Sequence, residues 1–271
     1  MPLPSRRLSL PANWPAMTGN KGDGAISDQM QIFALPNIPA IQPGDDLCRM
    51  IIEYGPATHD IIVIAQKVIS KSEGRIVHLG SVSPSQQAED LALETGKDAR
   101  VVELVLRESA KVLRAAPGLM IVQHRLGYIM ANAGIDASNA GDEDQVILLP
   151  ENPDRSARQM ADAIKDQTDV DVGIIISDSW GRPWRLGTAG FAIGLAGVQS
   201  VIDMRGTPDL DGRALQATSI GVGDELAAAA SLLMGQANEG RPVVVIRGLQ
   251  LQSNESCAQD LVRPAEEDLF R

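Results

Sequence analysis

The chain has 271 residues, enough for one large domain or two closely packed ones with a substantial apolar core. Its formal net charge of −11 excludes a general nucleic-acid-binding protein, because phosphate backbones are held by clustered lysine and arginine side chains. No apolar run reaches the roughly 18 to 20 residues that span a bilayer. We therefore expect a globular protein with neither a nucleic acid nor a membrane as a partner.

The first thirty residues lack the pattern of an export signal. Arg6 and Arg7 are followed by a stretch that prolines and glycines interrupt, so the apolar core of a signal peptide is missing. This composition buries too little surface to offset chain entropy, which predicts a flexible extension over residues 1–30. A folded domain is expected over 31–250, with a C-terminal tail over 251–271.

The two cysteines, Cys48 and Cys257, lie far apart and form neither a metal-ligand pair nor a redox motif. Unpaired thiols in a reducing compartment are the favoured interpretation over a disulfide. The protein is therefore expected to be cytoplasmic.

Strands and helices alternate along the predicted domain. The apolar run that ends at Gln66 is typical of a strand buried on both faces, and it delivers polar Gln66 and Lys67 at the strand's end. Ser85 is placed to cap a helix that stops at Gly96, and apolar residues at helical spacing predict another helix from Asp98 to Pro117. Asn152, followed by proline and aspartate, is a further helix start.

The second half of the chain predicts two more buried strands, at 172–176 and 243–246, and an alanine-rich helix over 224–234. Between the strands, four glycines punctuate an apolar stretch: Gly187, Gly190, Gly194 and Gly197. They suggest close backbone approach, in which tight packing of a loop or helix is favoured over contact with a ligand. A compact polar loop at 236–242 joins the last helix to the last strand.

Two acids stand out because each lies in a turn-like segment rich in small polar residues. Asp136 lies between Asn132 and Asn139, and Asp178 directly follows an apolar strand. Rigidly held carboxylates suit a hard cation, so the pattern predicts metal-dependent chemistry. The alternative is that both acids simply form turns, and spacing alone does not separate the two interpretations.

The sequence allows two roles for several basic and aromatic side chains. Lys67 and Lys71 are either ordinary solvated lysines or a means of neutralising a polyphosphate in an acidic chain. Arg182 and Arg185, which flank Trp180 and Trp184, suit surface packing as well as contact with an anionic substrate. The three histidines have no partner acid at motif spacing and are expected to be structural or exposed.

Five segments in order resemble the F420-0:gamma-glutamyl ligase family from about residue 33 to 249. They are Pro39-Ala-Ile41-Gln-Pro-Gly44-Asp-Asp-Leu47, Val68-Ile-Ser-Lys71-Ser-Glu-Gly-Arg75, Asn132-Ala-Gly-Ile-Asp136-Ala-Ser-Asn139, Ile176-Ser-Asp178-Ser-Trp-Gly-Arg182 and Leu233-Met-Gly-Gln236. The resemblance implies a homodimeric enzyme with an α/β (α+β) mixed-sheet ligase fold, neither a P-loop nor a Rossmann fold. The chain indeed contains no Gly-x-x-x-x-Gly-Lys-Ser/Thr motif.

The resemblance also implies the reaction and its site. GTP would drive amide formation between L-glutamate and the lactyl carboxylate of a deazaflavin precursor, coenzyme F420-0. The resemblance further implies two divalent ions, Mg²⁺ or Mn²⁺, and allows K⁺ as an additional cofactor. The residues carried over for the nucleotide are Ile38, Pro39, Ala40, Ile41, Gln66, Lys67, Lys71, Asn139, Met234, Gly235, Gln236, Ala237, Asn238, Glu239, Gly240 and Arg241. Those for metal are Asp136, Asp178, Ser179 and Gln236, and those for catalysis are Asp136, Asp178 and Lys71.

A carboxylate is a poor acylating group, so the hypothesis is that GTP first phosphorylates it and glutamate then attacks the acyl phosphate. No general base is identifiable. Two departures from the family pattern are Ser179, where threonine is also common, and the bulky Trp180. Two alternatives stay open: the same chemistry on another small carboxylic acid, and a non-catalytic guanine-nucleotide-binding homologue.

Overall fold

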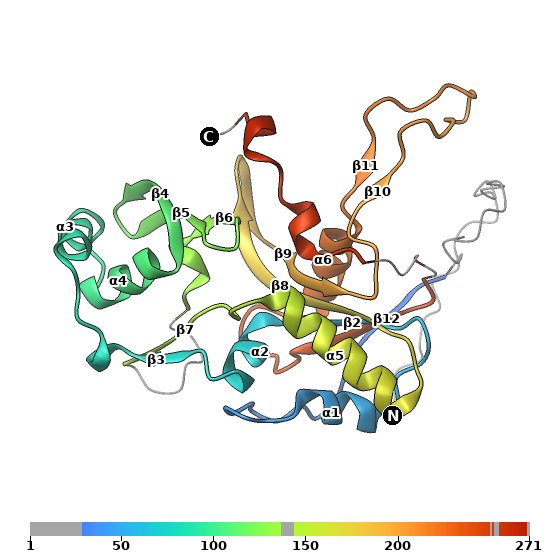
Figure 1. Ribbon diagram of the computed structural model, residues 1–271, viewed down its shortest axis with the longest axis horizontal. Coiled ribbons are helices and arrows are strands. Elements are labelled where there is room, and N and C mark those ends of the chain that lie inside the picture. Colours follow the sequence, from blue (N-terminus) through green and yellow to red (C-terminus); the bar gives the residue numbers. More distant parts are fainter. Residues whose placement is uncertain (1–28, 137–143, 250, 252–254, 270–271) are drawn as a thin grey trace, which may run out of the picture.

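The computed structural model describes residues 29–136, 144–249, 251 and 255–269 (Figure 1). Its centre is a five-stranded sheet in the order β1-β12-β2-β8-β9, in which only β2 and β8 are parallel neighbours. The strands are β1 Gln31–Ala34, β2 Ile61–Ala65, β8 Gly173–Arg182, β9 Arg185–Ala196 and β12 Val243–Arg247. The predicted mixed α/β fold is confirmed, and this antiparallel-rich order differs from a doubly wound parallel sheet.

Helices cover both faces of the sheet. The first face carries α1 Leu47–Tyr54, α2 Gln66–Ser72 and α5 Pro153–Thr168, and the second carries α6 Val222–Met234 and the short η3 Ala258–Leu261. Alternate residues of each strand enter different cores: Ile62 and Ile64 pack under α5, whereas Ile61 and Val63 pack under α6. The period-two alternation of a strand buried on both faces therefore builds the two layers.

A separate lobe is inserted between α2 and α5, and it lies on the left in Figure 1. Its elements are β3 Ile76–His78, η1 Leu79–Ser81, α3 Gln86–Thr95, α4 Ala99–Arg107, β4 Ser109–Ala116, β5 Leu119–His124, β6 Ile129–Ala131, η2 Asn132–Gly134 and β7 Gln145–Ile147. The remaining elements are β10 Ile202–Asp203 and β11 Ser219–Ile220, which form an outlying ribbon, and η4 Ala265–Glu267.

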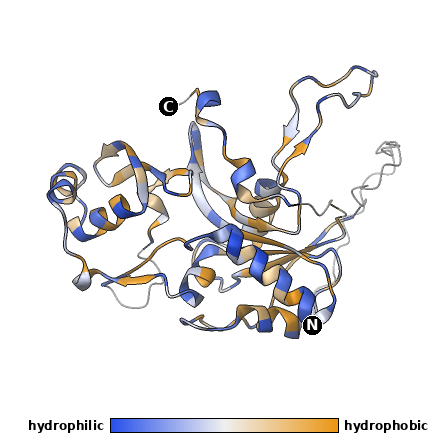
Figure 2. Cartoon of the chain, in the orientation of Figure 1, coloured by the Kyte–Doolittle hydropathy of each residue, from blue (hydrophilic) through white to orange (hydrophobic). Residues whose placement is uncertain are grey.

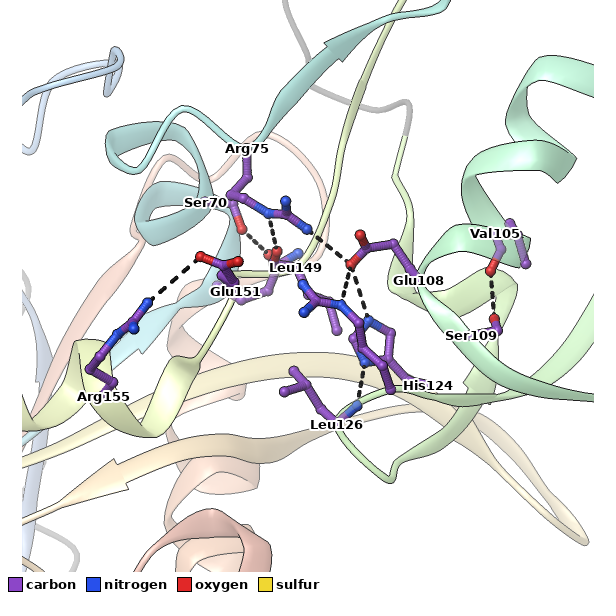
Figure 3. A network of polar contacts seen from close by, with 12 residues as sticks. Ser70, Arg75, Val105, Glu108, Ser109, His124, Leu126, Leu149, Glu151 and Arg155 are labelled. Atoms are coloured by element: carbon purple, nitrogen blue, oxygen red, sulfur yellow. Dashed lines mark hydrogen bonds and ion pairs between the residues drawn. The ribbon is translucent and has the colours of Figure 1, made fainter. Parts of the chain in front are cut away.

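A network of charged groups joins the lobe to the sheet domain (Figure 3). Arg75, which precedes β3, donates from Nε to the Leu149 carbonyl, 2.9 Å away, and so ties the two ends of the inserted lobe together. Its Nη2 also donates to Oε2 of Glu108 at 2.9 Å, and Nε of Arg125 reaches the same oxygen at 3.1 Å. One carboxylate thus connects three segments that are distant in sequence.

The helix starts read from Ser85 and Asn152, and the helix end read from Gly96, are confirmed. Ser85 accepts from the Ala88 backbone N–H at the start of α3, and Gly96 ends that helix in the left-handed conformation at φ 68°. Asn152 caps α5 in the same way, with proline at the first helical position. Along α5, hydrophilic and hydrophobic residues are interleaved, as a helix with one buried face requires (Figure 2).

The predicted helix from Asp98 to Pro117 is wrong in its second half. Asp98 does cap α4, but the helix ends at Arg107, and residues 109–116 form β4. Pro117 and Gly118, expected to stop a helix, instead form the turn between β4 and β5, with Gly118 at φ 79°. Pairing with β5 gives residues around Val112 partners that helical spacing alone could not reveal.

The glycine-rich stretch is neither a loop nor a helix but mainly strand β9. Close approach is confirmed: a Cβ on Gly190 would lie 2.4 Å from the Ala227 carbonyl oxygen of α6, and one on Gly194 would lie 2.4 Å from Pro153 of α5. Glycine therefore lets helices on opposite faces touch the backbone of the same strand.

The described part of the predicted C-terminal tail contributes to packing. Ala258 is fully buried, and Oδ1 of Asp154 accepts from the backbone N–H groups of both Ala258 and Leu195, each at 2.8 Å. Cys48 and Cys257 are both free, as predicted. No helix in the described ranges has the length and apolar character needed to cross a membrane.

Candidate functional site

The site lies where the two parallel strands end. β2 ends at Ala65, which is paired with Ser177 of β8, and α2 begins at the next residue, Gln66. Beyond Ser177, β8 continues as a hairpin with β9 alone. The carboxyl ends of adjacent parallel strands thus place Gln66 and Lys67 beside Asp178, which is where ligands bind in many α/β proteins.

Asp178 lies within β8, opposite Phe191, and not in a turn after the strand as the sequence suggested. The strand extends further than its apolar run because pairing with β9 supplies backbone partners. Burial, with a smaller contribution from the nearby Asp136 carboxylate, raises the pKa of Asp178 to about 6. The Ser179 backbone N–H, the Lys67 ammonium and the Gln66 side chain act in the opposite direction but do not cancel this increase. The Gln66 amide oxygen accepts from Ser70 Oγ at 3.0 Å, which orients this side chain.

Asp136 and Asp178 are brought together through Lys67. Nζ of Lys67 lies 2.7 Å from Oδ2 of Asp136, and the same ammonium acts electrostatically on Asp178. Asp136 follows η2 and is held by backbone hydrogen bonds with Ile147 in both directions, 3.0 and 2.8 Å. Acids about forty residues apart in sequence therefore both lie within electrostatic reach of one ammonium, and their shared divalent ion stays a prediction.

The opposite wall of the site comes from the end of α6 and the loop after it. Ser179 Oγ donates to Oε1 of Gln236 at 2.9 Å, which joins β8 to this loop. Gly235 ends α6 with φ 74°, and a side chain there would collide with Glu239. Glu239 turns inward on its own loop, where Oε2 accepts from the Ala237 backbone N–H at 2.9 Å.

These walls enclose a polar cleft of about 430 Å³. Lys71, one turn of α2 beyond Lys67, faces it, and both burial and the Lys67 charge lower the pKa of Lys71. The cleft is lined by Pro39, Ala40, Ile41, Ala65, Gln66, Lys67, Val68, Lys71, Ser177, Asp178, Ser179, Gly190, Ser231, Met234, Gly235, Gln236, Ala237, Asn238, Gly240, Arg241 and Pro242.

Most of the described residues expected at the nucleotide line this cleft, but Ile38 and Glu239 do not. Ile38 packs against the core under α5, and Glu239 is directed into its own loop. Asn139 lies outside the described residues. Asp136 borders the cleft through its ion pair with Lys67.

Sequence reasoning missed the small residues that make room in the cleft, among them Ser177, Gly190 and Ser231. Gly190 carried a signal, because its glycine spacing already suggested close approach. The two serines carried none, since their place in the cleft follows from the pairing of β8 with β9 and from the packing of α6.

The donor set fits a hard divalent cation. Asp136, Asp178, Ser179 and Gln236 offer oxygen ligands, which Mg²⁺ and Mn²⁺ prefer, and the two carboxylates are close enough for the Asp136 charge to act on Asp178. Within the described ranges, no cluster of three or more histidine, cysteine, aspartate or glutamate side chains forms another candidate. A softer metal has no ligand set among these residues.

Fold and cleft together define a mixed-sheet α/β protein with a polar, acid- and lysine-containing cleft at the carboxyl ends of its parallel strands. The family described as F420-0:Gamma-glutamyl ligase matches residues 36–248. The chain is 44% identical over 247 residues to a Methanopyrus kandleri protein named Coenzyme F420:L-glutamate ligase, covering 89% of this chain and 98% of that one.

Proteins with the same name show comparable similarity. One from Methanothermobacter thermautotrophicus is 42% identical over 251 residues, covering 89% of this chain and 99% of the relative. One from Methanocaldococcus jannaschii is 41% identical over 236 residues, covering 86% and 94%. The chain therefore belongs to the F420-0:gamma-glutamyl ligase family, and it is a ligase.

Proposed function

We propose that the protein is a GTP-dependent, GDP-forming ligase that joins L-glutamate to the lactyl carboxylate of the deazaflavin precursor coenzyme F420-0. The names of its relatives support the glutamate and F420 part of this proposal. The observation that carries it is the approach of Asp136 and Asp178 to one ammonium, Lys67, at the edge of a cleft. A site of this kind suits a highly charged phosphate ligand and a divalent ion.

The reaction requires activation because a carboxylate oxygen is a poor leaving group. In the proposed first step, a lactyl carboxylate oxygen attacks the γ-phosphorus of GTP, the bond to the β-phosphate oxygen breaks, and GDP leaves. The glutamate amine then attacks the acyl carbon of the acyl phosphate, losing a proton as the amide forms and inorganic phosphate departs. Positioning and charge stabilisation are the protein's main contributions to such phosphoryl transfer.

The chain's own groups have distinct tasks in this proposal. Lys71 would contact the triphosphate, in a cleft where burial first and the neighbouring Lys67 ammonium second lower its pKa. The loop residues from Met234 to Arg241 would surround the nucleotide. Asp136, Asp178, Ser179 and Gln236 would hold Mg²⁺ or Mn²⁺, which when bound supplies positive charge for the phosphates.

The proposal also includes four features that stay predictions. They are a second divalent ion, a role for K⁺, assembly as a homodimer and a cytoplasmic location. The exposed β8–β9 turn, with Trp184 81% and Leu186 99% exposed, offers apolar surface suited to self-association.

A panel of acceptors tests the proposal directly. The protein is incubated with GTP, Mn²⁺ and L-glutamate, together with either coenzyme F420-0 or another small carboxylic acid, and GDP and amide product are measured. We expect both products with coenzyme F420-0 in equal amounts. Amide formed only with another acid would refute the deazaflavin acceptor, and nucleotide binding without GDP release would indicate a non-catalytic homologue.

A further inference from the structure

Three aromatic side chains form a cluster beside the cleft. The rings of Trp180 in β8 and Phe191 in β9 are stacked, with centroids 4.5 Å apart and planes at 14°. Tyr128, which precedes β6, lies against Trp180 with a centroid distance of 6.0 Å. Aromatic rings contribute 3% of this chain, so three in contact next to a candidate active site are a notable concentration.

The cluster lies on the same strand face as Asp178. Trp180 is two residues further along β8, so its side chain leaves the same face about 7 Å from Asp178 along the strand. Phe191 is the direct cross-strand partner of Asp178. Side chains of directly opposed residues lie side by side on one face of a sheet, which makes the aromatic surface continuous with the carboxylate.

A second cavity of about 220 Å³ opens against these rings. Tyr128, Trp180 and Phe191 line it together with Ile129, and its charged lining residues are Arg263, Asp224 and Asp268. Sites that enclose a whole drug-sized ligand measure roughly 300 to 1,000 Å³. This cavity therefore suits one part of a larger molecule that extends from the neighbouring cleft.

Core packing accounts for only part of the cluster. Tyr128 is buried, and its hydroxyl donates to the Ile193 carbonyl at 2.8 Å, so this residue has a structural task. Trp180 and Phe191 are each only partly buried and both border the cavity. Trp180 packs against the core and, like Phe191, also borders the cavity, so the two rings provide a flat apolar surface for another ring.

We propose that the Trp180–Phe191 pair is the subsite on which the planar ring system of the acceptor stacks while its carboxylate lies at Asp178. This inference rests on the proposed function, since it assigns the aromatic part of the same substrate. A reacting carboxylate and a ring at opposite ends of one molecule require two adjacent pockets of different polarity. The cleft is lined by Ser177, Asp178 and Ser179 of β8 and the aromatic cavity by the next residue, Trp180, so neighbouring residues of one strand supply that pair.

The test compares Trp180→Ala with the wild type by titrating coenzyme F420-0 and following the fluorescence of its deazaflavin ring. We expect ring quenching on binding to wild type, and a rise of about tenfold in Kd for the variant, equivalent to about 1.4 kcal/mol. The KM for the acceptor should rise in parallel, whereas the KM for GTP should stay the same. Trp180→Phe, which keeps a ring, should restore most of the affinity.

Two controls separate stacking from misfolding. Tyr54→Ala removes an exposed ring at the end of α1 that lines neither cavity, and this variant should bind the acceptor as the wild type does. A ring-free phosphodiester of lactate should react equally well with wild type and Trp180→Ala. Two results would overturn the aromatic subsite. One is that Trp180→Ala loses as much activity with the ring-free acceptor as with coenzyme F420-0, and the other is that its Kd for coenzyme F420-0 lies within twofold of the wild-type value.

The proposed function can fail separately. If wild type turns over coenzyme F420-0 and Trp180→Ala retains its affinity, only the aromatic subsite is refuted. If wild type neither binds nor converts the deazaflavin, both the acceptor assignment and the subsite are refuted.

Discussion

The Glu108 carboxylate should contribute measurably to the attachment of the inserted lobe. It receives Arg75 and Arg125 at 2.9 and 3.1 Å, and only 11% of its side chain is exposed (Figure 3). The His124 ring is fully buried, its Nδ1 accepts from the Leu126 backbone N–H, and its Nε2 is the ring nitrogen that faces Glu108. Nε2 lies 3.6 Å from Oε2 of Glu108, a long polar contact that still favours the charged carboxylate. The perturbation is Glu108→Gln.

The pKa of Glu108 gives the size of the effect. Burial acts to raise it, but His124 and the two guanidinium groups outweigh burial and lower the pKa from 4.5 to about 2. At 1.36 kcal/mol per pKa unit, that difference corresponds to on the order of 3 kcal/mol of stabilisation by the charged form. Because the folded-state pKa is depressed, this stabilisation is complete above about pH 4.5 and is lost as the pH falls toward 2.

Urea denaturation of wild type and Glu108→Gln at several pH values measures this contribution. We expect the variant to be less stable by about 2 to 4 kcal/mol at pH 7, with the difference shrinking below pH 4 as the wild-type carboxylate becomes protonated. Glu53→Gln, in an exposed pair with Arg49, is the matched control and should change stability by less than about 1 kcal/mol. A Glu108→Gln effect as small as the control, or one independent of pH, would refute the reasoning.

Three further substitutions test the site and the fold. Asp178→Asn should lower kcat at saturating GTP and Mn²⁺ by about a hundredfold or more, whereas Asp162→Asn on α5 should not; near-native GDP release would exclude the metal role. Lys71→Met should raise the KM for GTP by about tenfold, with the exposed Lys111→Met unchanged; equal KM values would remove Lys71 from the nucleotide site. Gly194→Ala should destabilise the protein by about 1 to 3 kcal/mol in urea, because its Cβ would lie 2.4 Å from Pro153, while Gly181→Ala meets nothing within 4 Å; similar midpoints for both would contradict the packing argument.

Features set by local interactions could be predicted from the sequence. Ser85 and Asn152 were recognised as helix caps because a cap bonds within three residues of itself. The buried strand at 61–65 was recognised because both of its faces are apolar. In each case the residues that decide the structure lie within the same short stretch of sequence.

Features set by distant partners could not be predicted in this way. Residues 109–116 have an apolar pattern that suits a helix, and only pairing with β5 fixes them as a strand. Likewise, nothing local to Asp178 indicates that β8 runs on to Arg182, since its partners in β9 lie beyond a turn. Non-local pairing therefore explains both the wrong helix and the misplaced acid.

The corrected place of Asp178 strengthens the argument for its role. A carboxylate in a turn can move with its loop, whereas Asp178 is fixed by the β8–β9 ladder and approached by Gln66, which Ser70 orients in turn. Side chains on regular elements with such support hold a binding geometry more accurately than side chains on loops. The same ladder that fixes Asp178 also fixes Phe191 opposite it and Trp180 beyond it. A single hairpin therefore sets the distance between the polar and the aromatic parts of the proposed substrate site.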